Sequence, residues 1–172
     1  MRGSETRAEC LAVFALLLLA VLAGCSGEAD LTVLGGSQLG AAKQIVISDA
    51  DAEAGCVVVV PLVVSNISGI TSADFLVKFD DRILVAQGVR PTSFTQSFVV
   101  QPLIEAGSVG ITTVGPTLPL ISSPFVDIIF QVRRSTASGD TTRLVIDRAE
   151  LFDADDRRID SVRVKSGTFT VR

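Results

Sequence analysis

The sequence of 172 residues contains no histidine, no tryptophan and no tyrosine. Without histidine, Ser-His-Asp catalysis, Cys-His catalysis and His-ligated zinc are all excluded. The only aromatic side chains are nine phenylalanines. Sugar-binding faces usually stack tryptophan or tyrosine, whose rings combine an apolar face with a polar tip. A sugar-binding face made of phenylalanine alone is therefore an alternative that the composition disfavours.

An excess of positive charge is also missing, since the formal net charge is -4 and the charged residues are spread along the chain. A nucleic-acid-binding domain would show a basic stripe, and attachment to anionic lipid by charge alone would need a basic cluster. The three cysteines form no disulfide framework. Two of them, Cys10 and Cys25, lie in the amino-terminal segment, and Cys56 is predicted to be a small buried hydrophobe.

The chain begins with a short apolar run behind two arginines. Arg2 and Arg7 precede the run, which extends from Leu11 to Leu22. A helix needs about 20 apolar residues to cross a bilayer, so this run is too short. It has the length of the hydrophobic region of a signal peptide.

The residues that end this run, Leu22, Ala23, Gly24 and Cys25, resemble the bacterial lipobox. The resemblance implies cleavage before Cys25 and transfer of diacylglycerol to its thiol. The acyl chains would then hold the protein at a membrane by burying methylene groups. The predicted location is the bacterial cell envelope, at the outer membrane or cell surface and outside the cytoplasm. The alternatives are an ordinary cleaved signal peptide and an uncleaved anchor.

Three segments follow from this interpretation. Residues 1–24 are predicted to be the lipoprotein signal peptide. Residues 25–42, rich in small side chains and without a clear period, are predicted to be a lipidated tether. Residues 43–172 are predicted to be one folded domain.

The folded part is predicted to be all-β. In residues 73–79 the side chains alternate, with Phe75, Val77 and Phe79 on one face and Asp74, Leu76 and Lys78 on the other, which is the period of a strand. Short strands separated by Gly, Pro, Asn and Asp are typical of a sandwich, and no amphipathic helix follows the signal. The predicted strands are 44–48, 56–64, 73–79, 83–89, 97–102, 109–114, 125–132, 143–152, 158–164 and 167–171.

Two of these strands are apolar on both faces. Residues 56–64 are continuously apolar and are interrupted by Pro61, which donates no ladder hydrogen bond and so belongs at an edge or a bulge. Residues 125–132 also offer two apolar faces, which indicates a central strand.

Residues 58–81, V-x-V-P-L-V-V-S-N-I-S-G-I-x-x-A-D-F-x-V-K-F-D-D, resemble the start of a cohesin domain. Residues 107–111, 125–132, 144–152 and 167–171 agree with later parts of that pattern in the same order. The resemblance covers about residues 44–172. It implies a nine-stranded jelly-roll β-sandwich, related to bacterial carbohydrate-binding modules.

The resemblance also implies a function. Cohesins bind dockerins through one face of a sheet, and the corresponding strands here are residues 73–79 and parts of 97–114. The chain is therefore predicted to be a non-catalytic, membrane-anchored module that binds a dockerin-like or envelope protein. A carbohydrate-binding module for polysaccharide and a structural spacer are the alternatives, and no enzyme activity is predicted.

Six apolar residues are the candidates for partner contact. They lie on the implied binding strand, in a Ser/Thr/Gln-rich stretch and in a loop with three prolines. An exposed aromatic often anchors a partner, and a stiff loop loses little entropy on binding. For the phenylalanines of the polar stretch, the favoured interpretation is that one or both point into the core. The loop is equally interpreted as a cover for the sandwich edge. The six are Phe75, Val77, Phe94, Phe98, Leu118 and Leu120.

The densest acidic cluster, Asp153, Asp155 and Asp156, has two interpretations. Alternating carboxylates can converge on Ca²⁺, but the segment lacks the glycine and the later glutamate of an EF-hand loop. The favoured interpretation is a hairpin tip, with calcium as the alternative. No other cofactor is predicted.

Overall fold

The structure, a computed structural model, describes residues 42–172. This part of the chain contains no helix, and so none that is long and apolar enough to cross a membrane. The predicted signal peptide, with Leu22, Ala23, Gly24 and Cys25, lies outside the described residues. The predicted tether lies outside them too, except for its last residue, Ala42.

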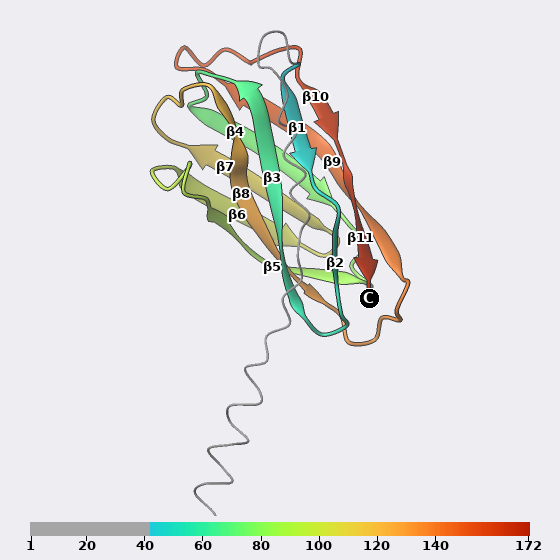
Figure 1. The fold of residues 1–172 in the computed structure, drawn as a ribbon. Helices are drawn as coiled ribbons and strands as arrows, with labels where there is room; N and C mark the ends of the chain where they lie inside the picture. Colours follow the sequence, from blue (N-terminus) through green and yellow to red (C-terminus); the bar gives the residue numbers. More distant parts are fainter. Residues whose placement is uncertain (1–41) are drawn as a thin grey trace, which may run out of the picture.

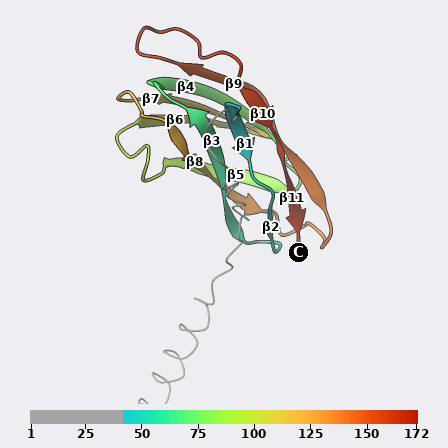
Figure 2. The ribbon, with the colours of Figure 1, turned by 45° about the horizontal axis from the view of Figure 1, so that its top comes forward.

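The described residues form two stacked sheets (Figures 1 and 2). The strands are β1 (Gln44–Ile47), β2 (Ala50–Ala52), β3 (Val57–Ile67), β4 (Ser72–Lys78), β5 (Leu84–Pro91), β6 (Val99–Glu105), β7 (Ser108–Val114), β8 (Ile121–Val132), β9 (Thr141–Phe152), β10 (Arg163–Lys165) and β11 (Gly167–Val171). The first sheet has the order β10-β1-β3-β8-β5, and the second has the order β2-β11-β9-β4-β7-β6. The predicted β-sandwich is confirmed.

The implied number of strands was nine, and the structure divides the described chain into eleven. One added division falls where the chain passes from one sheet to the other. β1 pairs with β3 in the first sheet, and after Ser48 and Asp49 the chain continues as β2, which pairs with β11 in the second. The crossing buries Ile45 and Ile47 on one side and Ala50 and Ala52 on the other, so both halves contribute to one core.

Phenylalanine rings fill the space between the sheets. Phe75 packs edge-to-face against Phe125 with ring centroids 5.9 Å apart, and Phe79 packs against Phe130 at 5.0 Å. Such pairs stabilise a core beyond the area that they bury. Phe169 is also fully buried.

The central pair of the first sheet is β3 and β8, in antiparallel register from Val57 opposite Gln131 to Ile67 opposite Ile121. Pro61 lies inside this central strand opposite Asp127, and the register shifts between Leu62 and Val63. The predicted bulge near the proline is therefore present, while its alternative, an edge strand, is not.

Cys56 is buried just before β3, as predicted. All buried hydrophobic residues among the described ones lie between Ile45 and Val171. The fragment 43–172 thus contains both sheets and their core, and we expect it to fold on its own.

Candidate functional site

The outer side of the second sheet is an exposed face formed by β6, β7, β4 and β9. On each of these strands the side chains point alternately toward and away from the core. The register between the strands aligns the outward-facing residues in four rows across the sheet. The rows are Val99-Val114-Ser72-Phe152, Gln101-Thr112-Asp74-Glu150, Leu103-Gly110-Leu76-Arg148 and Glu105-Ser108-Lys78-Val145. None of these sixteen residues is buried. We call them the outer face.

The β6 and β7 half of the outer face exposes three aliphatic side chains. Leu103 is 65% exposed, Val99 is 62% exposed and Val114 is 56% exposed. Gly110 lies opposite Leu103 and carries no side chain, so nothing covers the leucine from β7. Exposed aliphatic side chains grouped in this way favour contact with another molecule.

The β4 and β9 half of the outer face is charged and internally paired. Thr112 donates a hydrogen bond of 2.7 Å from its hydroxyl to Asp74, and Lys78 forms an ion pair of 2.8 Å with Asp147. Arg148 lies opposite Leu76 and forms no hydrogen bond or ion pair with the described residues through its side chain. This half therefore presents charged side chains beside the exposed aliphatic side chains of β6 and β7.

The comparisons with known proteins agree with this architecture. The family model of the cohesin domain matches residues 43–171. The chain belongs to the cohesin family. Comparison with curated proteins finds no match.

Solved cohesins share the fold at low sequence identity. The sixth cohesin of scaffoldin B from Acetivibrio cellulolyticus, in complex with a Cel5 dockerin mutant, is similar with a TM-score of 0.68 and 20% identity, over 77% of this chain and 100% of that one. A non-cellulosomal cohesin from the archaeon Archaeoglobus fulgidus has a TM-score of 0.67 and 19% identity, over 77% and 92%. A cohesin–dockerin complex from Clostridium thermocellum, Coh-OlpA with Doc918, has 0.66 and 15%, over 77% and 100%.

Two predicted contact residues of this cohesin lie on the side of β4 that faces the core. Phe75 and Val77 belong to β4, and both are buried between the sheets. Successive side chains of a strand point to opposite faces, so the outward residues are Asp74, Leu76 and Lys78. The prediction of Phe75 and Val77 as contact residues is wrong.

Two further predicted contact residues are also buried. Phe98 packs edge-to-face on Phe125 at 5.7 Å, and Leu118 is fixed by its backbone, which donates to Ile70 and accepts from Gly69. Both are core residues, so their prediction as contacts is wrong. Phe94 and Leu120, the remaining two, are exposed and stay candidates.

The acidic cluster of this cohesin forms a turn. The Asp153 carboxylate accepts hydrogen bonds of 2.9 Å from the backbone N–H groups of Asp155 and Arg157. Asp155 pairs with Arg157, and Asp156 has a positive φ of 59°. Residues 42–172 contain no group of three or more acidic, Cys or His side chains placed to hold a metal ion. The calcium alternative for Asp153, Asp155 and Asp156 is therefore not supported.

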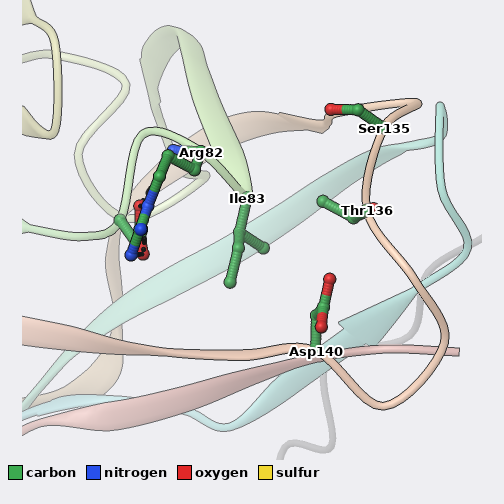
Figure 3. Close-up of a pocket in the computed structure, with 6 residues that line it drawn as sticks. Arg82, Ile83, Ser135, Thr136 and Asp140 are labelled. Atoms are coloured by element: carbon green, nitrogen blue, oxygen red, sulfur yellow. Dashed lines mark hydrogen bonds and ion pairs between the residues drawn. The ribbon is translucent and has the colours of Figure 1, made fainter.

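One polar hollow of about 340 Å³ lies at an end of the sandwich, lined by Asp80, Arg82, Ile83, Ser135, Thr136 and Asp140. Figure 3 shows Arg82 on one side and Ser135, Thr136 and Asp140 on the other, with Ile83 between them. Asp80 forms an ion pair of 2.6 Å with Arg82, and Asp140 accepts a hydrogen bond from the Ala137 backbone. Both carboxylates thus serve their own loops, which does not favour a catalytic pair.

The residues that sequence reasoning missed are the exposed ones on β6. Val99 fell within the predicted strand 97–102, but Leu103 was left outside it because β6 extends to Glu105. The register of β6 with β7 places Leu103 opposite Gly110. The register of β7 with β4 places Gly110 opposite Leu76. The apolar pair Leu103-Ile104 before a Gly-containing turn was the available signal.

Proposed function

We propose that this cohesin is a non-catalytic module that binds a protein partner through the outer face. The observation that carries the proposal is the row of Leu103, Gly110 and Leu76. The polar row that contains Gln101 and Thr112 separates it from a second exposed aliphatic pair, Val99 and Val114. A partner that covers these side chains removes apolar surface from water, which is the main driving force of association. Arg148 at the end of the row would set the orientation of the partner.

The solved relatives support a partner of the dockerin type. The Acetivibrio cellulolyticus and Clostridium thermocellum cohesins are described as complexes with dockerins. The relative from Archaeoglobus fulgidus is described as non-cellulosomal, so membership of the family does not imply a cellulosome. We propose a dockerin-like or cell-envelope protein as the partner.

A carbohydrate ligand is the weaker candidate. The outer face carries one aromatic ring, Phe152, which is half-buried. Phe94 is exposed but lies in the loop before β6. A flat sugar platform needs several exposed rings in line, so these positions favour a protein partner.

We also propose that the domain is anchored to a membrane outside the cytoplasm by a lipid on Cys25. The support is the sequence of Leu22, Ala23, Gly24 and Cys25 at the end of a signal-length apolar run. The 18 residues between this cysteine and β1, residues 26–43, would let the domain stand clear of the lipid surface.

The test captures a partner and then measures the effect of the outer face on its binding. The fragment 43–172 is immobilised, envelope proteins of the source organism are passed over it, and the captured protein is purified and titrated by calorimetry. Leu103→Glu is expected to weaken binding by about tenfold or more, because it places a carboxylate in the apolar row.

The matched control is Val164→Glu, which makes the same kind of change at an exposed valine on β10, in the other sheet. It is expected to bind as the wild type does. Equal loss in both variants, or no loss in Leu103→Glu, would contradict the assignment of the outer face. Binding to a glycan array without any protein partner would favour the carbohydrate candidate.

A further inference from the structure

The first sheet has an exposed side that the proposed function leaves unused. β3, β8, β1 and β5 direct six aliphatic side chains away from the core, and the register places Val59 opposite Ile129 and Val63 opposite both Val46 and Pro124. Figure 1 looks onto this sheet, with β1 and β3 in front of the second sheet. We call the six residues the valine face: Val46, Val57, Val59, Val63, Val85 and Ile129.

The composition of β3 is that of a strand covered on both sides. From Val57 to Val64 every residue is apolar. Buried side chains alternate with the half-buried or exposed ones of the valine face, except at Pro61, which is buried as well. A strand with water on one side normally alternates with polar residues, whereas a continuous apolar run is typical of a strand covered on both faces. Within residues 42–172 the sandwich covers one side of β3, and no described residue provides the cover that the sequence of β3 indicates for its other side.

The valine face contains a charged pair near its centre, since Asp127 lies opposite Pro61 on the same side of β8 as Ile129. The one charged pair within it, Arg90 and Asp127 at 3.1 Å, is satisfied inside the sheet. The polar hollow of Figure 3 is lined by none of the six residues. A flat apolar sheet packs best on a second flat sheet, at a spacing of about 10 Å.

The size of the first sheet suits a dimer. Its strands β10, β1, β3, β8 and β5 contain 3, 4, 11, 12 and 8 residues. With a strand spacing of about 4.8 Å and a rise of about 3.4 Å per residue, the flat area is roughly 600 Å² before side-chain relief is added. Stable interfaces bury about 800 Å² per partner, and homodimer interfaces are the more apolar ones.

We propose that the valine face is the interface of a homodimer, in which the first sheets of two copies pack face to face. An aliphatic face is complementary to itself under a twofold axis. An axis parallel to the strands places β10 of one copy, with Arg163 and Lys165, over the β5 edge of the other. The two basic β10 strands are then kept apart.

The dimer leaves both outer faces free, since each belongs to the second sheet on the far side of its copy. Two partner-binding faces would point in opposite directions. Such a module binds two partners, or one partner with two sites at raised avidity.

Sedimentation of the fragment 43–172 tests the dimer. The wild type is expected to sediment with twice the mass of one chain, and Val59→Lys to sediment as a monomer, because it places an ammonium group at the centre of the interface. Thermal unfolding of each variant checks its fold. Val85→Lys, nearer the rim, gives a second and milder variant, with dimer dissociation expected at concentrations at least tenfold higher than for the wild type.

Leu103→Glu is the matched control, since it lies on the opposite sheet and is expected to leave the dimer intact. A wild type that is monomeric up to about 1 mM would overturn the proposal. A dimer that persists in folded Val59→Lys would overturn the assignment of the valine face. Dimerisation of 43–172 but not of 26–172 would mean that residues before 43 occupy the face, and would equally overturn it. Each chain of Val59→Lys is expected to bind the partner as a wild-type chain does. The dimer proposal and the outer-face proposal are therefore tested independently.

Discussion

Neighbouring residues of β4 have opposite roles, and the single-residue alternation of a strand decides which role each takes. Phe75 is buried against Phe125, while Leu76 lies on the outer face. Both are large and apolar, so composition alone does not separate them. The pattern of 73–79 distinguished two sides correctly, but it did not say which side the second sheet covers.

This difference predicts different costs of truncation at the two positions. Phe75→Ala is expected to lower the free energy of unfolding by about 3–5 kcal/mol, since it leaves a cavity between the sheets. Leu76→Ala is expected to lower it by about 1 kcal/mol or less and to weaken partner binding instead. Urea unfolding measures the first effect and calorimetric titration the second. Similar destabilisation by both substitutions would argue against the assigned sides.

A second single-residue prediction concerns pH. The Arg82 side chain, by hydrogen bonding to Asp80, lowers the pKa of that carboxyl from 3.8 to about 2. Because folding lowers this pKa, the pair stabilises the folded state above about pH 3.8, and its contribution disappears as the pH falls towards 2. Arg82→Ala is expected to return the pKa of Asp80 towards 3.8 in an NMR titration. An unchanged pKa would mean that the ion pair is not formed in solution.

At the scale of elements, the crossing from β1 to β2 depends on Gly167 at the start of β11. A Cβ at this position would lie 2.6 Å from the Ser48 carbonyl oxygen and 2.7 Å from that of Ile47. Both are backbone atoms, so the clash cannot be relieved by rotating a side chain. The close approach holds the crossing segment against the second sheet.

Gly167→Ala is therefore expected to destabilise the domain by about 1–3 kcal/mol, as overpacking does in a tight core. Gly88→Ala on β5 is the control, since a Cβ there meets nothing within 4 Å. Thermal or urea unfolding of the two variants makes the comparison. Equal stability of both variants would show that the backbone of the crossing segment moves to accommodate the added methyl group at little cost in free energy.

The elements that the sequence predicted best are those with strong periodicity or continuous apolar runs. The predicted strands 56–64, 73–79 and 125–132 correspond to β3, β4 and part of β8. The prediction was poor for β6 and for 158–164, where the short strand β10 begins only at Arg163. These edge segments bury few side chains, so their pairing is set by the neighbouring strand and leaves little trace in local pattern.

The candidate site was harder to predict than the core, for the same reason. The strands of the outer face were implied by the resemblance to cohesins, but four of the six named contact residues are buried. Apolar character predicts burial far more often than it predicts contact with a partner. The rows of the outer face exist only through register between strands, which one sequence does not display.

At the scale of the whole molecule, the proposed anchor makes a direct prediction about Cys25. Intact-mass spectrometry of the protein purified from membranes is expected to show a chain that begins at Cys25 and carries diacylglycerol on its thiol. Cys25→Ser is expected to abolish the modification and release the protein from the membrane fraction. An unmodified or disulfide-linked Cys25 in the wild type would contradict the anchor.

The β6 strand ends the second sheet and exposes Val99, Leu103 and Ile104, yet it contains Pro102. Proline has no amide hydrogen, so a strand of another molecule that pairs along the β6 edge would lack one of its backbone hydrogen bonds. A domain that exposes apolar side chains on an edge strand for recognition is at risk of edge-to-edge association into fibres. Pro102 therefore disfavours edge-to-edge polymerisation through β6 and leaves the outer face available to a partner.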